Sequence, residues 1–185
     1  RRLRKPAAMD AAVARLRADP EGAGAATADL VIEAVFEDLQ VKRAVYERLE
    51  GNLRPGVVIA TNTSSIPLEE LAGCLREPGR LIGMHFFNPV SKLPLVEIIA
   101  ATGSRTDALS TGTAFARRIG KLPVPCRSHP GFLVNRILAP YMGEAMEMAR
   151  EGVPLAEIDQ AALEFGMPMG PVELADAVGL DVAEH

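Results

Sequence analysis

The sequence has little cysteine and no long apolar run. Its two cysteines, Cys74 and Cys126, are too few and too far apart for a metal cluster or a disulfide framework. No apolar run approaches the roughly 20 residues that a membrane-spanning helix needs. The basic start of the chain, residues 1–5, is not followed by the apolar segment of a secretory signal. We therefore expect a protein of a reducing compartment, the cytoplasm, with no membrane span.

The composition excludes further classes of protein. Hydrophobic residues make up 48% of the 185 residues and charged residues 24%, which is typical of a globular protein and not of a disordered one. The net charge of −4 argues against a nucleic-acid partner. We expect the basic residues at 1–5 to form a solvated helix face or a chain end. The length suits one or two modest domains with a buried core.

Short apolar runs alternate with helical patterns over the first two thirds of the chain. Strands are expected at residues 28–35, 57–60, 81–84, 94–99 and, because its two prolines indicate an edge strand, 121–126. Helices are expected at residues 7–18, at 39–50, from Pro67 onward and at 105–119. This alternation is typical of an open, mostly parallel α/β sheet covered by helices.

Polar residues follow three of the expected strands. Glu37 follows the first, Asn62 to Ser64 follow the second, and His85 and Asn88 follow the third. Ligands of such sheets bind beyond the carboxyl ends of the strands, so these residues predict a site at one edge. Ordinary turn and helix-cap chemistry is the alternative, and it stays open for residues 62–65 taken alone.

One carboxylate stands out within the apolar run 95–99. Glu97 has apolar neighbours on both sides, and a buried carboxylate without a partner is very costly. His85 is the nearest candidate partner in the sequence. A single histidine in a strand is more often structural than catalytic, so the pair becomes informative only if other residues converge on it.

The last third of the chain is expected to be helical. Ser128 to Gly131 indicate a linker, followed by helices at 132–151, 154–165 and 172–178. We therefore predict two domains, residues 1–127 with the sheet and residues 128–185 with the helices.

Several motifs together resemble those of the L-3-hydroxyacyl-CoA dehydrogenase family. They are TNTSS at 61–65, MHFFNP at 84–89, LVEII at 95–99 and HPGFLVNR at 129–136. FGMPMGP at 165–171 with AVGLD at 177–181 is similar to the form found in multifunctional fatty-acid β-oxidation enzymes. The resemblance implies a partial Rossmann-like, mostly parallel sheet followed by an incomplete, all-helical domain. It also implies NAD-dependent oxidation of L-3-hydroxyacyl-CoA to 3-ketoacyl-CoA.

The resemblance assigns four catalytic residues. His85 matches the base that takes the proton of the 3-hydroxyl group, and Glu97 matches the acid that orients it. Ser64 matches a residue that contacts substrate and cofactor near the reacting oxygen. Asn135 matches a residue of the helical domain that hydrogen-bonds near the substrate hydroxyl.

The resemblance also assigns cofactor contacts. Besides Ser64, the residues that match contacts to NAD are Val35, Phe36, Glu37, Lys42 and Asn88. An exposed helix lysine is the alternative for Lys42. For Phe86 and Phe87 we predict packing alone, since aromatic residues after a strand mostly pack.

The sequence departs from the family at its beginning. A dinucleotide site normally opens with a strand, G-x-G-x-x-G and a helix, and none of this occurs in the chain. Gly22 to Ala26 lie between an expected helix and an expected strand, and we interpret them as a loop. The chain is thus expected either to be a fragment, which the initial Arg1 favours, or to be a truncated protein. In both cases we expect weak NAD binding.

Two other functions remain open at this point. One is a non-catalytic relative that serves a structural or acyl-CoA-binding role. The other is a different NAD(P)-dependent oxidoreductase with a catalytic lysine in its helical domain, but no lysine follows Lys121. The resemblance further implies an acyl-CoA substrate, and either a homodimer through the helical domain or membership of a larger multifunctional complex.

Overall fold

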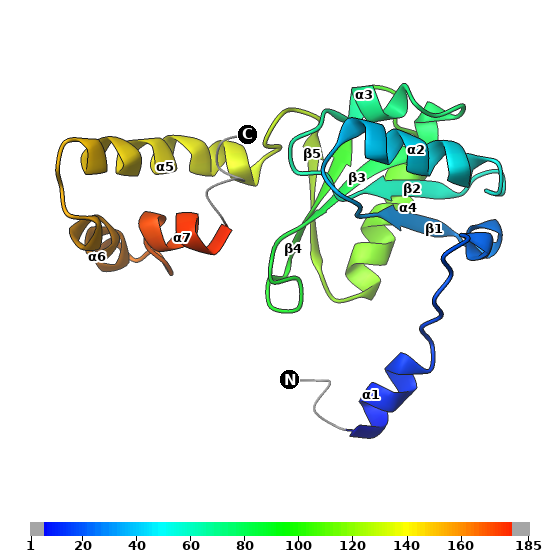
Figure 1. Ribbon diagram of the computed structural model, residues 1–185, viewed down its shortest axis with the longest axis horizontal. Helices are drawn as coiled ribbons and strands as arrows, with labels where there is room; N and C mark the ends of the chain where they lie inside the picture. The colour runs from blue at the N-terminus through cyan, green and yellow to red at the C-terminus, as the bar shows by residue number, and fades with distance from the viewer. Residues whose placement is uncertain (1–5, 179–185) are drawn as a thin grey trace.

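A five-stranded sheet forms the centre of the first two thirds of the chain (Figure 1). The computed structural model describes residues 6–178. The strands lie side by side in chain order: β1 (Leu30–Glu33), β2 (Val58–Thr61), β3 (Leu81–Phe86), β4 (Leu95–Ala100) and β5 (Leu122–Arg127). The strands β1 to β3 are parallel, β4 is antiparallel to β3, and β5 is parallel to β4. The expected mostly parallel sheet is confirmed, with β5 at an edge.

Helices cover both faces of this sheet. Alternate residues of β2 and β3 point to opposite faces. Ile59 and Leu81 pack with Tyr46 of α2 (Leu39–Glu50) and Leu71 of α3 (Leu68–Ala72). On the other face, a cluster that includes Val58, Ala60, Ile82, Met84, Val96 and Ile98 packs against α4 (Thr106–Arg118).

Helix α4 lies very close to the sheet because its buried face carries small residues. Ala108, Gly112 and Ala116 are buried and spaced four residues apart, so they share one face of the helix. A Cβ atom added at Gly112 would lie 2.4 Å from Cδ1 of Ile82. A side chain at residue 112 would therefore force the end of the Ile82 side chain to move.

Two expected elements are shorter than the sequence predicts. The helix expected at 7–18 is α1 (Pro6–Val13); it ends early because the N–H groups of Arg15 and Leu16 bond three residues back, which closes a turn. The strand expected at 28–35 is β1, at 30–33. It ends at Glu33 because the Val35 N–H donates to the Glu33 side chain at 2.9 Å and not to a neighbouring strand.

The remaining helices lie to one side of the sheet (Figure 1). They are α5 (Val134–Arg150), α6 (Leu155–Phe165) and α7 (Pro171–Val178). Helix α5 runs without a break through Pro140. Residues 179–181 of the AVGLD motif lie outside the described residues. Within 6–178, no helix is both long and apolar enough to cross a bilayer.

Candidate active site

His85 and Glu97 lie opposite each other on two neighbouring strands. The antiparallel register of β3 and β4 pairs these two residues, which places their side chains on the same face of the sheet. Nδ1 of His85 lies 2.7 Å from Oε2 of Glu97. Glu97 is 0% exposed, as the apolar run around it indicates, and His85 is also buried. The buried carboxylate therefore has the partner that its environment requires.

The second oxygen of Glu97 binds the start of helix α5. Oε1 accepts the backbone N–H groups of Leu133 at 2.9 Å and Val134 at 2.8 Å. Burial raises the pKa of Glu97, but the hydrogen bonds from His85 and from these two N–H groups outweigh it, so the pKa lies below its usual value. An ionised carboxylate only accepts hydrogen bonds, so Nδ1 of His85 carries the proton and Nε2 is left as the acceptor.

Two aromatic rings flank the imidazole of His85. The ring of Phe87 lies edge-on at a centroid distance of 4.6 Å, and the ring of Phe132 lies at 5.7 Å. Phe132 is buried and has a φ of 45°, a strained value for a residue with a side chain. Phe86 packs against the apolar core beside α4. Sequence reasoning missed Phe132, whose backbone strain leaves no signal in the residue order.

Glu37 binds the loop that carries Ser64. Its Oε1 atom accepts the hydroxyl of Thr63, the N–H of Ser64 at 2.9 Å and the N–H of Ser65 at 3.3 Å. Burial raises the pKa of Glu37, but the bonds from Thr63, Ser64 and Lys42 outweigh it, so its pKa lies below the usual value. The residues that follow β1 and β2 are thus joined beyond the carboxyl ends of these two strands.

Lys42 is buried beneath the carboxyl ends of β1 and β2. Its side chain is 1% exposed, and Nζ lies 2.8 Å from Glu33 and 3.2 Å from Glu37. The alternative of an exposed helix lysine is therefore wrong. Sequence reasoning also missed Glu33, although the argument applied to Glu97 could have found it, since Glu33 too lies within an apolar run.

The other predicted site residues are exposed. Val35 and Phe36 follow β1, with Phe36 81% exposed. Asn88 is exposed three residues after His85, and Asn135 is exposed in the first turn of α5, next to Val134. The structure thus groups His85 with Glu97, and Glu37 with Ser64 and Lys42. The roles of Val35, Phe36, Asn88 and Asn135 stay predictions.

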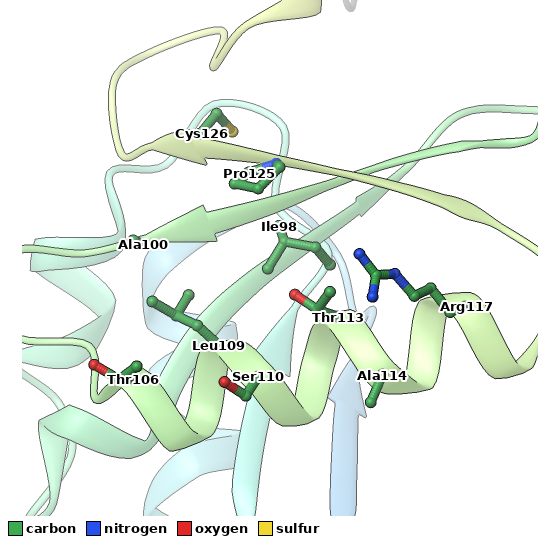
Figure 2. A pocket seen from close by; sticks show the side chains of 10 residues that line it. All are labelled: Ile98, Ala100, Thr106, Leu109, Ser110, Thr113, Ala114, Arg117, Pro125 and Cys126. Atoms are coloured by element: carbon green, nitrogen blue, oxygen red, sulfur yellow. The ribbon is translucent and has the colours of Figure 1, made fainter.

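A separate hollow of about 370 Å³ lies between α4 and the strands β4 and β5. Figure 2 shows Leu109 and Thr113 of α4 pointing toward Ile98 of β4, with Arg117 at one end. None of the predicted site residues lines this hollow. The candidate site is therefore defined by its converging polar side chains and not by this hollow.

Comparison with known families covers almost the whole chain. Residues 1–129 match the family described as 3-hydroxyacyl-CoA dehydrogenase, NAD binding domain, and residues 131–185 match its C-terminal domain. Among curated relatives, the fatty acid oxidation complex subunit alpha of Vibrio cholerae is 40% identical over 98% of this chain, and that of Psychrobacter cryohalolentis is 44% identical over 97%. The chain spans about a quarter of these relatives, 26% and 25% of their lengths.

Solved structures agree with this assignment. The (S)-3-hydroxybutyryl-CoA dehydrogenase of Ralstonia eutropha superposes with a TM-score of 0.90 at 37% identity, covering 95% of this chain and 62% of that one. The 3-hydroxybutyryl-CoA dehydrogenase of Escherichia coli superposes with a TM-score of 0.89 at 39% identity, covering 96% and 38%. This chain belongs to the 3-hydroxyacyl-CoA dehydrogenase family.

Proposed function

We propose that this chain supplies the proton-transfer site of an NAD-dependent enzyme that oxidises L-3-hydroxyacyl-CoA to 3-ketoacyl-CoA in fatty-acid β-oxidation. The observation that carries the proposal is the buried His85–Glu97 pair, whose atoms Nδ1 and Oε2 lie 2.7 Å apart. The names of the relatives, 3-hydroxybutyryl-CoA dehydrogenase and fatty acid oxidation complex subunit alpha, support this class of reaction.

His85 is the proposed base. Because Glu97 accepts a hydrogen bond from the N–H group at Nδ1, the lone pair of Nε2 is free to take the proton of the 3-hydroxyl group. Histidine suits this step because imidazole gains and loses a proton near neutral pH. The Glu97 carboxylate would then stabilise the imidazolium that forms, as in other pairs of histidine and carboxylate.

Ser64 and Asn135 are the proposed hydrogen-bond donors to the reacting oxygen. Ser64 lies in the loop after β2, and Asn135 lies in the first turn of α5, which Glu97 holds through Leu133 and Val134. In the reverse reaction these donors would stabilise the alkoxide on C3 before His85 delivers its proton. We place the acyl-CoA substrate between them, a usual position for a ligand between two domains.

The carboxyl ends of β1 and β2 fit the nicotinamide half of NAD. NAD⁺, when bound, accepts the hydride that leaves C3 of the substrate. Val35 and Phe36 are exposed after β1, and Glu37, the next residue in the chain, binds the polar loop after β2. The residues that we assign to this half are Val35, Phe36, Glu37, Lys42, Ser64 and Asn88. Because Lys42 is buried, it would act through the carboxylate of Glu37.

The test is turnover of acetoacetyl-CoA with NADH by the complete enzyme. We expect His85→Gln to lower kcat by roughly 100-fold or more, because it removes the general acid–base group. NADH binding, measured by fluorescence titration, should be unchanged. His129→Gln, which alters an exposed histidine of the linker, is the control and should keep full activity.

Two results would count against the proposal. Full turnover by His85→Gln would refute the assignment of the base. A wild-type enzyme that binds acetoacetyl-CoA and NADH but does not oxidise NADH would favour the non-catalytic, acyl-CoA-binding alternative. Homodimerisation through α5–α7, or membership of a larger multifunctional complex, is a separate proposal that light scattering of the complete protein would test.

A further inference from the structure

A buried carboxylate that the proposed mechanism does not use lies at the end of β1. Glu33 is 3% exposed. Its Oε1 atom accepts the Val35 N–H at 2.9 Å and Lys42 Nζ at 2.8 Å. Its Oε2 atom accepts the hydroxyls of Tyr46 at 2.9 Å and Thr61 at 2.8 Å. Four donors, one from the segment after β1, two from α2 and one from β2, thus occupy the four acceptor positions of one carboxylate.

Lys42 connects this carboxylate to a second one. Its Nζ atom lies 2.8 Å from Oε1 of Glu33 and 3.2 Å from Oε2 of Glu37. A buried ammonium group requires such partners, because desolvation without them costs several kcal/mol. Glu33 is the inner partner, at 0% side-chain exposure, and Glu37 is the outer one at 34%.

Glu37 connects Lys42 to the loop after β2. While Oε2 faces Lys42, Oε1 binds the hydroxyl of Thr63 and the N–H groups of Ser64 and Ser65. A chain of direct contacts therefore runs from the interior of the sheet to Ser64. Every link in it joins groups of opposite charge, or a carboxylate and a hydrogen-bond donor.

We infer that Glu33 is a positioning residue of the cofactor site. It fixes Lys42, and through Lys42 it fixes the Glu37 carboxylate and the 63–65 loop in the arrangement that receives the nicotinamide ribose. This inference rests on the proposed function, which places the cofactor at that edge. Glu33 itself is too deeply buried to touch cofactor or substrate, so it acts through its neighbours.

The test is Glu33→Gln in the complete enzyme. The amide keeps the size of the side chain but removes the negative charge that pairs with Lys42. Its NH₂ group also either opposes the ammonium or forces the hydroxyls of Tyr46 and Thr61 to turn from donors into acceptors. We expect the Kd for NADH, measured by fluorescence titration, to rise about tenfold, the effect of losing one hydrogen bond to a charged group. The KM for acetoacetyl-CoA should rise by less than the NADH Kd, because among the proposed substrate contacts only Ser64 lies on the loop that Glu33 fixes.

Glu50→Gln is the matched control. Glu50 also lies on α2, at its other end, and its carboxylate accepts the backbone N–H of Arg76 at 3.0 and 2.9 Å. The same chemical change there should leave both the NADH Kd and the acetoacetyl-CoA KM at their wild-type values. A rise in NADH Kd in Glu50→Gln as large as in Glu33→Gln would overturn the inference.

Two further variants keep the inference testable if Glu33→Gln does not fold. Lys42→Met should show the same selective rise in the NADH Kd, and Tyr46→Phe, which removes one donor to Glu33, should show a smaller one. Where all variants fold, the double variant of Glu33 and Lys42 should be no worse than the poorer single one, because both act in one unit.

The outcomes separate this inference from the proposed function. Unchanged NADH affinity in Lys42→Met and Tyr46→Phe, or an equal rise of NADH Kd and acetoacetyl-CoA KM in Glu33→Gln, would overturn the inference. Absence of turnover in the wild type, with NADH binding intact, would overturn the proposed function alone. The loss of NADH affinity itself is measured by binding and needs no turnover.

Discussion

At the scale of single residues, Glu97 connects three parts of the molecule. One oxygen holds the imidazole of β3, and the other holds two N–H groups at the start of α5. Its side chain is fully buried, so solvent does not replace these bonds. Charge-assisted hydrogen bonds of this kind each contribute about 1.5 to 3 kcal/mol.

We predict that Glu97→Gln lowers the free energy of unfolding by about 2 kcal/mol at pH 7. The folded-state pKa of Glu97 lies below its usual value of 4.5, so its carboxylate stabilises the fold above that pH. This stabilisation is lost as the pH falls from 4.5 through the folded-state pKa. The difference between wild type and variant in urea unfolding should therefore shrink between pH 5 and pH 3. A difference that is constant over this range would contradict the ionic role of Glu97.

At the scale of single residues, the sequence predicted a contact where one charged residue in an apolar run required a partner. The apolar run around Glu97 required a buried partner, and His85 is that partner. The contacts of Glu97 with residues 133 and 134 could not be predicted, because backbone N–H groups look alike in every sequence. Glu33 lies in a similar apolar run and carries the same signal as Glu97.

At the scale of secondary-structure elements, α7 depends on a side chain from α6. Asp159 accepts the N–H groups of Val172 at 2.8 Å and Glu173 at 3.1 Å, in the first turn of α7. A Cβ atom added at Gly170 would lie 2.1 Å from Oδ1 of Asp159, so glycine is needed at that turn. Asp159 thus links α6 to the first turn of α7 and satisfies two N–H groups there.

We predict that Asp159→Ala lowers the free energy of unfolding by about 1 kcal/mol, the usual cost of losing a helix cap. Hydrogen exchange at the amides of Val172 and Glu173 should be faster in this variant. Asp159→Asn keeps an acceptor oxygen and should lose less. Glu164→Ala, which alters another acid of α6, is the control and should leave exchange in α7 unchanged.

The ends of elements were harder to predict than their presence. All five strands and the helices from α2 onward occur where the sequence places them, because buried apolar runs and helical spacing span several residues. The strand β1 is shorter than expected since the side chain of Glu33 competes for the N–H of Val35. Such local competition depends on which way one side chain turns.

At the scale of the whole molecule, the two edges of the sheet differ. Strand β1 lies at one end of the strand order, and within residues 6–178 no strand pairs with its outer side. Its residue Ile32 is 39% exposed. Strand β5, at the other end, contains Pro123 and Pro125, which cannot donate backbone hydrogen bonds. Of the two edge strands in the described part of the chain, β1 is therefore the better template for another strand.

We predict that the isolated 185-residue chain self-associates through β1. Ile32→Lys should lower the apparent mass in light scattering over a concentration series, because a charge on an edge strand opposes pairing. Leu122→Lys is the matched control, on the exposed start of β5, and should change the mass much less. Equal effects of the two variants would show that association does not use the β1 edge.

The overall architecture was predictable, but the direction of β4 was not. The alternation of strands and helices indicated a mostly parallel sheet. The loop between β3 and β4 carries no helix, so β4 runs antiparallel and brings Glu97 opposite His85. The His85–Glu97 pair therefore arises from a hairpin within an otherwise parallel order.

The two bonds from Glu97 to the start of α5 also have a mechanical consequence. Any rotation of α5–α7 that keeps these bonds must turn about Leu133 and Val134. Atoms near a rotation axis move least. The imidazole of His85 is held by the same carboxylate that binds Leu133 and Val134. Opening and closing of the helical part would thus carry distant residues through large arcs, while the proposed base stays nearly still.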